Sequence, residues 1–198
     1  MKKVRFVIFV LLALAISATA QAQQLNRNKV QWSMDIMPVG GSLYDSGRIG
    51  GALAGVDAAV TAMVIPQVGF RVGLQAAYLA GPKGSQNWKF GDKAVFAPSM
   101  TVDVLWDIRN TFSKSSDIRY NIQPFFRFST LMGTGNGQLA MSVGLGAGIR
   151  QLFKINSRIG IVWDMNAVIS SDNAWHNQEP GKGKILFAQS GVGINYAF

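Results

Sequence analysis

The chain has 198 residues, with 19 lysines and arginines, 10 aspartates and glutamates, 22 glycines, one histidine and no cysteine. Of all residues 48% are hydrophobic and 15% are charged. This excludes a disordered chain, and the lack of cysteine excludes a disulfide scaffold and a cysteine-ligated metal site. The length fits one domain.

The first predicted element is a secretory signal peptide over residues 1–22. It has three basic residues within the first five positions, an uninterrupted apolar run over residues 6–16, and the small-x-small cleavage pattern Ala20-Gln21-Ala22. The run is too short to cross a membrane as a helix, which takes about 20 apolar residues. Cleavage lowers the net charge from +9 to +6. An exported chain of this charge is not expected to bind nucleic acid.

Residues 23–198 are predicted to form one domain of eight β-strands. Apolar and polar residues alternate strictly in eight segments, which is typical of strands with one apolar face. In chain order the segments are residues 30–36, 52–62, 68–78, 96–108, 118–129, 139–150, 158–169 and 191–198. The polar or glycine-rich connectors at 40–50, 81–93, 133–138 and 170–184 alternate with generally shorter ones. We therefore expect an up-and-down antiparallel meander with four long loops at one end.

The apolar face of these strands is predicted to point outward, to lipid. A soluble barrel of the lipocalin type would reverse the two faces and carry lysine and glutamate along its strands. Here every lysine after residue 22 lies in a connector or at a strand edge, and the one glutamate, Glu179, lies in the last long connector. Aromatic residues, Phe187 among them, gather toward the strand ends, as in the girdles of outer-membrane barrels. Pro98 and Pro124 fall inside strands, where bulges or weakened ladder pairing are expected.

The end of the chain carries the most specific motif. Gly193, Tyr196 and Phe198 are spaced as a glycine, two residues, an aromatic residue, one residue and a terminal phenylalanine. With the eight alternating segments, this motif resembles the small eight-stranded outer-membrane β-barrels of Gram-negative bacteria, the OmpX type and the transmembrane part of OmpA. Val192 departs from the polar residue that usually precedes the glycine. The resemblance implies an all-β, eight-stranded antiparallel up-and-down transmembrane β-barrel in the cell outer membrane, recognised by the barrel-assembly machinery.

Ten charged residues at inward positions are predicted to form an ion-pair network in the lumen. They are Asp35, Asp57, Arg71, Asp103, Asp107, Arg119, Arg127, Arg150, Arg158 and Asp164. Acids and bases balance in this set, and charges in a poorly hydrated lumen are costly unless they are paired. Eight strands leave little interior beyond what side chains fill. Two interpretations stay open, a plug of ion pairs and a narrow channel for small polar solutes.

The second long connector is basic, with Lys83, Lys89 and Lys93 around Trp88. These residues form either a surface patch that meets lipopolysaccharide phosphates or an acidic partner, or an ordinary solvated loop.

His176 is the one imidazole in the chain, and Ser170, Ser171, Asp172 and Glu179 lie near it in sequence. A Ser/His/acid arrangement would suit acyl chemistry on lipid A, but no motif joins these residues, so we expect no enzyme.

Neither a cofactor nor a metal site is expected. The sequence favours a monomeric envelope protein that contacts outer-membrane lipid and lipopolysaccharide. Its expected role is structural or in surface interaction, covering envelope integrity, adhesion or lipopolysaccharide contact. A narrow channel and a lipid A-modifying enzyme are the alternatives.

Overall fold

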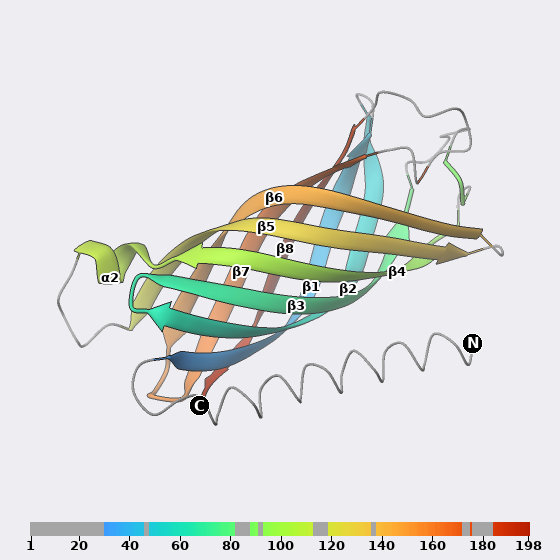
Figure 1. Ribbon diagram of the computed structural model, residues 1–198. Helices are drawn as coiled ribbons and strands as arrows, with labels where there is room; N and C mark the ends of the chain where they lie inside the picture. The colour runs from blue at the N-terminus through green and yellow to red at the C-terminus, as the bar shows by residue number, and fades with distance from the viewer. Residues whose placement is uncertain are drawn as a thin grey trace.

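The eight predicted strands form a closed barrel (Figure 1). The computed structural model describes residues 30–45, 48–81, 88–90, 93–112, 119–135, 138–171, 175 and 184–198. The strands are β1 (Gln31–Asp45), β2 (Arg48–Ile65), β3 (Val68–Ala80), β4 (Val95–Trp106), β5 (Tyr120–Gly135), β6 (Gln138–Lys154), β7 (Ile159–Ser171) and β8 (Lys184–Ala197), with a short helix α2 (Ile108–Phe112) between β4 and β5. Within these ranges no helix is long and apolar enough to cross a membrane.

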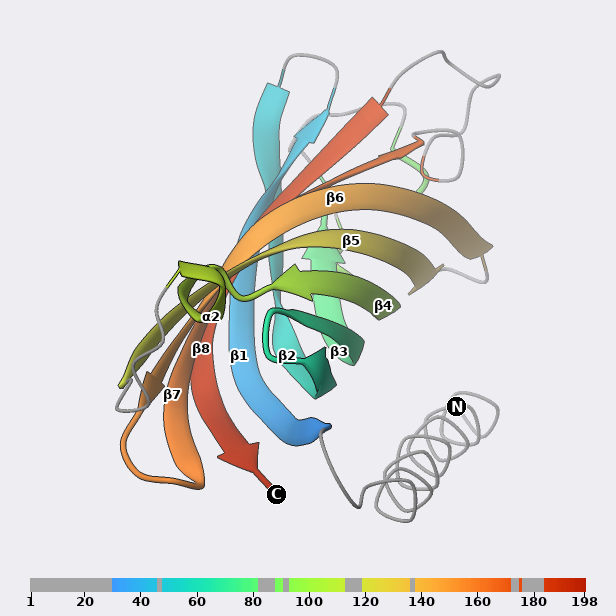
Figure 2. The same ribbon diagram turned by 60° about the vertical axis from the view of Figure 1, so that its left-hand side comes forward.

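Each strand pairs antiparallel with the next, and the last strand closes the barrel. β8 pairs with β1 from Ser33–Ala197 to Asp45–Ile185, and Figure 2 shows β8 (red) beside β1 (blue). The predicted eight-stranded antiparallel up-and-down barrel is therefore confirmed. The signal peptide predicted over residues 1–22 lies outside the described residues.

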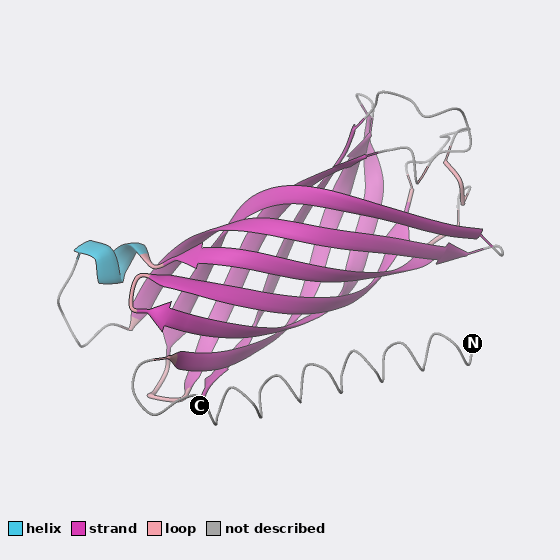
Figure 3. Ribbon diagram, viewed as in Figure 1, coloured by secondary structure: helices cyan, strands magenta, loops and turns pink. Residues whose placement is uncertain are grey.

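The connections define two ends of the barrel. At the terminal end β1 begins and β8 ends, and the connections are the turn at 66–67, the segment with α2, and the turn at 155–158. At the loop end the chain passes from β1 to β2 and from β5 to β6 across two residues each, while residues 81–94 and 172–183 form the longer connections. Figure 3 shows α2 (cyan) at the terminal end. The prediction of four long loops at one end is thus wrong, since the strands continue into two of the predicted loops and leave only two residues between them.

β1 extends well past residue 36, where the prediction ended it. The prediction stopped too early because glycine and proline conceal the alternation in this part of the strand. Pro38, Gly40 and Gly41 interrupt the apolar–polar pattern, yet the pairing with β2 runs on to Asp45. A β-carbon on Gly41 would overlap the carbonyl oxygen of Ala188 on β8. Glycine is thus required at this close approach of two strands.

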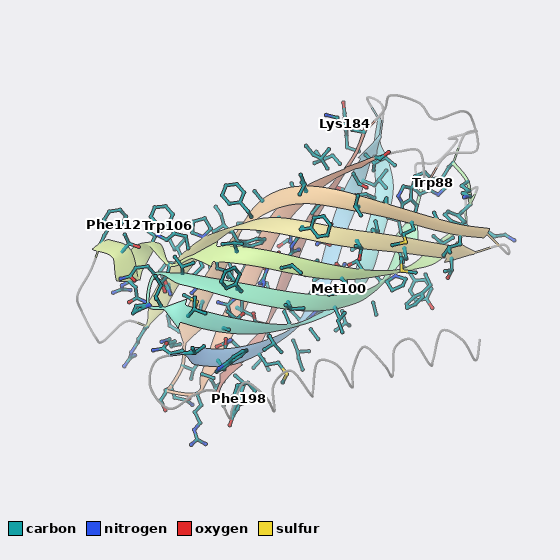
Figure 4. All side chains as sticks on the ribbon, viewed as in Figure 1. Trp88, Met100, Trp106, Phe112, Lys184 and Phe198 are labelled. Atoms are coloured by element: carbon teal, nitrogen blue, oxygen red, sulfur yellow. The ribbon has the colours of Figure 1, made fainter. Side chains whose placement is uncertain are left out.

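The outer face of the barrel is apolar, as predicted. Large hydrophobic side chains at alternating positions of the strands are exposed, among them Val72, Val104 and Ile194. Figure 4 places Trp106, Phe112 and Phe198 at the terminal end and Trp88 and Lys184 at the loop end. Phe187 was predicted for the outer aromatic girdle, but it is buried inside the barrel.

The two prolines lie where the ladder needs no amide donor. In the β4–β5 ladder Phe96 and Ser99 are paired, but Pro98 between them is not. The predicted weakening at Pro98 is confirmed. Pro124 pairs with Ile149 on β6 and lies just beyond the last β4–β5 pair. Proline has no N–H to donate, so both positions avoid a lost hydrogen bond.

The helix α2 lies in a connection for which no element was predicted. Asp107 caps it, because its Oδ1 accepts a hydrogen bond from the Asn110 amide at 2.8 Å. An aspartate at this position satisfies one of the free N–H groups of the first turn. The alternation of β4 continues through Ile108 in the sequence, so the start of the helix was assigned to the strand.

Candidate functional site

Three groups of side chains fill the interior, from the terminal end to the loop end. We call them the Asp107 cluster, the charge network and the aromatic cluster, and each is defined below. The cluster nearest the terminal end surrounds Asp107, which is buried. Its Oδ2 accepts hydrogen bonds from the side-chain amides of Asn110 at 2.9 Å, Gln123 at 3.4 Å and Asn121. Side-chain amides and a backbone N–H of the first turn of α2 therefore stabilise the negative charge of this carboxylate.

The first half of the charge network is centred on Asp103 of β4. Arg127 of β5 donates to both of its oxygens, from Nε at 2.8 Å and from Nη2 at 2.9 Å. Arg71 of β3 donates from Nε to Asp103 at 2.7 Å, and its Nη2 lies 2.6 Å from Asp164 Oδ2 on β7. Both guanidinium groups lie over the ring of Phe125, 4.7 and 5.0 Å from its centroid.

The second half of the charge network is centred on Asp35 of β1. Arg150 of β6 binds it with two donors, Nε at 3.0 Å and Nη2 at 2.8 Å. Asn195 of β8 donates to the same carboxylate at 2.7 Å, and Arg150 also donates to Gln123. The Arg71 guanidinium, 3.9 Å from Asp35, joins the two halves. Paired charges therefore connect strands on opposite sides of the lumen.

Four predicted members take no part in these ion pairs. Asp107 is held by amide donors, and Asp57 is buried with no ion pair among the described residues. Arg119 and Arg158 are exposed in the connections at the terminal end. Among the described residues, the buried charged side chains are five aspartates, Asp35, Asp57, Asp103, Asp107 and Asp164, and three arginines, Arg71, Arg127 and Arg150. The expected balance of charge is therefore wrong for the described lumen, which has two more acids than bases. Alternation assigned Arg119 and Arg158 to the inward face. Both lie just beyond the end of a strand, where the barrel no longer encloses an interior.

The aromatic cluster closes the loop end. Trp88 and Phe90 come from the connection after β3, Trp175 from the connection after β7, and Phe187 from β8. The rings of Trp88 and Trp175 are stacked at 5.6 Å, and Phe90 and Phe187 meet Trp175 edge-on at 6.0 and 6.2 Å. Trp175 Nε1 donates to Ser142 at 3.0 Å, and the backbone amide of Lys89 donates to the carbonyl of Trp175 at 2.8 Å. The two longer connections are thus joined to each other over the mouth of the barrel.

The aromatic cluster takes Trp88 out of the predicted basic surface patch of Lys83, Trp88, Lys89 and Lys93. Trp88 is 2% exposed, so it belongs to the interior and not to a surface patch. Lys89 is half-buried, and its Nζ donates to the carbonyl of Leu139 at 3.1 Å. Lys93 is exposed, and Lys83 lies outside the described residues. The sequence signal for the aromatic cluster was the occurrence of two tryptophans in otherwise polar connectors.

A small cavity of about 30 Å³ lies between the charge network and the aromatic cluster. Gln75, Thr101 and Arg127 line its polar side, and Leu53 and Phe187 its apolar side. A chain of side-chain hydrogen bonds crosses the lumen here. It runs from Ser99 to Gln75 at 3.3 Å, Gln75 to Gln189 at 3.1 Å, Gln189 to Asn166 at 3.0 Å, and Asn166 to Asp164 at 2.9 Å.

No family model and no curated protein matches the sequence, but several solved structures match the fold. Neisserial surface protein A has a TM-score of 0.56 and 10% identity, over 86% of this chain and 100% of that one. Ail, the attachment invasion locus protein of Yersinia pestis, has a TM-score of 0.52 and 12% identity over the same shares. The outer membrane protein OprG of Pseudomonas aeruginosa has a TM-score of 0.50 and 9% identity, over 86% and 96%. The chain has the fold of the small eight-stranded outer-membrane β-barrels.

The candidate acyl site of this outer-membrane-type barrel is only partly described. Ser170 is buried, and its hydroxyl donates to the carbonyl of Val143 at 3.0 Å. His176, Asp172 and Glu179 lie outside the described residues. Ser170 therefore already has an acceptor inside the barrel.

The predicted C-terminal signal lies on the strand that closes the barrel. The rings of Tyr196 and Phe198 meet edge-on at 5.5 Å, and the Phe198 amide donates to the Trp32 carbonyl at 3.1 Å. A β-carbon on Gly193 would overlap the carbonyl oxygen of Ile36 and lie 2.6 Å from Met37 Cα. Packing of β8 against β1 therefore explains the glycine at this point of the motif.

Gly193→Ala is expected to destabilise the β1–β8 closure. Overpacking of this kind costs about 1–3 kcal/mol, since the clash is with backbone that cannot rotate away. Urea unfolding of the refolded barrel measures the loss. Ala197→Gly, on the same strand, is the comparison that should leave the closure intact, and equal stability of Gly193→Ala and the wild type would contradict the packing argument.

Proposed function

We propose that the protein is exported to the outer membrane and acts there as a closed barrel with a structural or surface-interaction role. The observation that carries this proposal is the combination of an apolar outer face with an interior filled by the charge network and the aromatic cluster. The first suits contact with hydrocarbon. The second obstructs the lumen with ion pairs across it and with packed rings at its mouth, which argues against an open pore.

The buried ion pairs support a plug more than a gate. Asp103 and Asp35 are each bound by an arginine through two donors, and their partners lie on different strands. Opening a path would separate charges in a medium of low polarity, where breaking one buried pair is strongly unfavourable. The proposed monomer is not expected to catalyse a reaction.

A role at the cell surface is the finer part of the proposal. The exposed charged side chains described at the loop end include Lys93 and Lys184, and Figure 4 places Lys184 at that rim. Cationic side chains there suit the phosphates of lipopolysaccharide or an acidic partner. One protein of similar fold is named for attachment and another as a surface protein, which agrees with this part of the proposal.

The purified barrel in planar lipid bilayers is expected to give little or no conductance, because the charge network and the aromatic cluster both obstruct the lumen. Steady large openings would contradict the plug.

The membrane location is tested separately, by comparing boiled and unboiled samples of the outer-membrane fraction on a gel. A folded barrel should migrate differently in the unboiled and the boiled sample. A soluble periplasmic product with equal mobility in both samples would refute the location.

The second candidate function is a narrow channel for small polar solutes. The excess of two buried carboxylates in the described lumen favours it, since such a path would attract cations. Small openings that select cations in the same recordings would favour the channel over the plug.

A further inference from the structure

The charged side chains exposed at the terminal end of the barrel are basic. Arg119, Lys154 and Arg158 are exposed there, and Arg109 is half-buried. The acid described at this end, Asp107, is buried and bound by amide donors. Within the described part of the chain, no ion pair joins any of these four bases to an acid. We call the four bases the basic rim.

The basic rim follows connections that lie next to one another. Arg109 on α2 donates from Nη1 to the carbonyl of Tyr120, where β5 begins. The backbone amide of Lys154 donates to the carbonyl of Arg119 at 2.6 Å, so these two residues are neighbours at the ends of β6 and β5. Arg158 lies in the tight turn that follows Lys154 and leads into β7. The positive charges therefore gather on one side of the terminal end, from α2 to the turn at 155–158.

Large apolar side chains are exposed between these bases. Phe112 at the end of α2 is 77% exposed, and Ile155 in the turn after β6 is 58% exposed. Phe112 meets Trp106 edge-on at 6.3 Å, and Trp106 Nε1 donates to the hydroxyl of Thr111 at 2.8 Å. Figure 4 places Trp106 and Phe112 together at this end. Apolar side chains in connections beyond the strands would face water if this end projected out of the membrane, whereas the bilayer interface would cover them.

Bases beside exposed apolar side chains suit the headgroup layer of a membrane that contains anionic lipid. Lysine and arginine keep their charged groups among the headgroups while their apolar stems lie against the chains, and a negative lipid surface attracts each of them. An acidic polymer in solution would match the charges but leave Phe112 and Ile155 in water. We propose that the basic rim binds the headgroups of anionic phospholipids such as phosphatidylglycerol in the leaflet that the terminal end reaches. This rests on the membrane location proposed above.

The test measures quenching of tryptophan fluorescence by brominated lipids in vesicles that contain the full refolded barrel. All vesicles have the same proportions of phosphatidylcholine and phosphatidylglycerol, and one or the other lipid carries the bromines, so the surface charge stays constant. Trp88 and Trp175 at the loop end are buried, whereas Trp106 and Trp163 are exposed. Trp163→Phe, present in every sample, leaves Trp106 as the most exposed of the described tryptophans. Quenching then reports the lipid beside the terminal end.

Brominated phosphatidylglycerol is expected to quench more than brominated phosphatidylcholine. The lipid beside Trp106 should favour the anionic headgroup by about fivefold, the factor that one base near an anionic surface contributes. The preference should fall as salt is added, because exposed charges are screened. Equal quenching by the two lipids, or a preference that salt does not change, would overturn the proposal.

Two variants locate the preference. Replacing Arg119, Lys154 and Arg158 together by glutamine removes three charges from exposed positions, where substitutions have little effect on stability, and should bring the preference close to one. Arg119→Lys with Arg158→Lys keeps the charges at the same positions and should keep the preference. Persistence of the preference in the glutamine variant, or its loss in the lysine variant, would contradict recognition of the headgroups by charge. If the glutamine variant fails to fold, the salt dependence of the wild type and the lysine variant still decide.

A cell-wall partner is the other occupant that the test can detect. Equal quenching by the two lipids, together with co-sedimentation of the micellar barrel with purified peptidoglycan that the glutamine variant loses, would assign the basic rim to the cell wall and overturn the proposal. Quenching by brominated phosphatidylcholine in itself reports a barrel within the bilayer. The membrane location can therefore stand when the lipid preference fails, and the loss of all quenching would count against both.

Discussion

Arg71→Met is expected to lower the free energy of unfolding by about 3–5 kcal/mol, the usual cost of removing one partner from a buried ion pair. Arg71 is 1% exposed and binds Asp103 at 2.7 Å and Asp164 at 2.6 Å. Methionine fills a similar volume but leaves Asp164 with no guanidinium among its described contacts. The loss is measured by urea unfolding of the refolded barrel, followed by tryptophan fluorescence.

Arg158→Gln is the matched control, because it removes the same charge from an exposed turn. Such a surface change is expected to stay within about 0.5 kcal/mol. Adding Asp164→Asn to Arg71→Met should recover part of the loss, since the two residues are in contact and their effects do not add. A loss from Arg71→Met as small as that of the control would mean that water reaches the charges, and would contradict a closed interior.

Trp175→Ala is expected to have an effect of similar size, about 3–5 kcal/mol. Trp175 is fully buried at the centre of the aromatic cluster, in contact with the rings of Trp88, Phe90 and Phe187. Its removal also takes away the hydrogen bond to Ser142. Because the two longer connections would lose their ring contacts over the mouth and keep only the backbone hydrogen bond from Lys89, bilayer recordings of this variant should show more frequent openings than the wild type.

Phe126→Ala is the comparison for this variant. Phe126 is 76% exposed on the outer face, where lipid or detergent fills the space of a shortened side chain. Its stability should therefore change much less than that of Trp175→Ala. Equal losses in the two variants would show that the aromatic cluster contributes no more than an outward-facing ring.

The strands and their faces were predictable because alternation is a local property of the sequence. Met100, Val102 and Val104 point outward on β4, and Asp103 points inward between the last two. The ends of the strands were less predictable. Glycine and proline conceal the pattern in β1, and the alternation of β4 runs on into the capped start of α2.

Part of the charge network also follows from an antiparallel meander. Asp103 lies directly opposite Arg71 on β3 and Arg127 on β5, so neighbouring strands are enough to bring these three together. Arg150 behaves differently. Its opposite residue on the next strand is Asp164, yet its guanidinium binds Asp35 across the lumen.

Alternation with a period of two residues was enough to predict the number of strands, their antiparallel order and the face of most strand residues, because it depends only on neighbouring positions. The depth of each residue along the barrel and its partner across the lumen depend on how the whole barrel closes. Closure places Asp35 against Arg150 and leaves Arg119 and Arg158 outside. It also brings Trp88 and Trp175 from separate connections to one mouth. These contacts join residues far apart in the chain, and the stagger and closure of all eight strands set their distances.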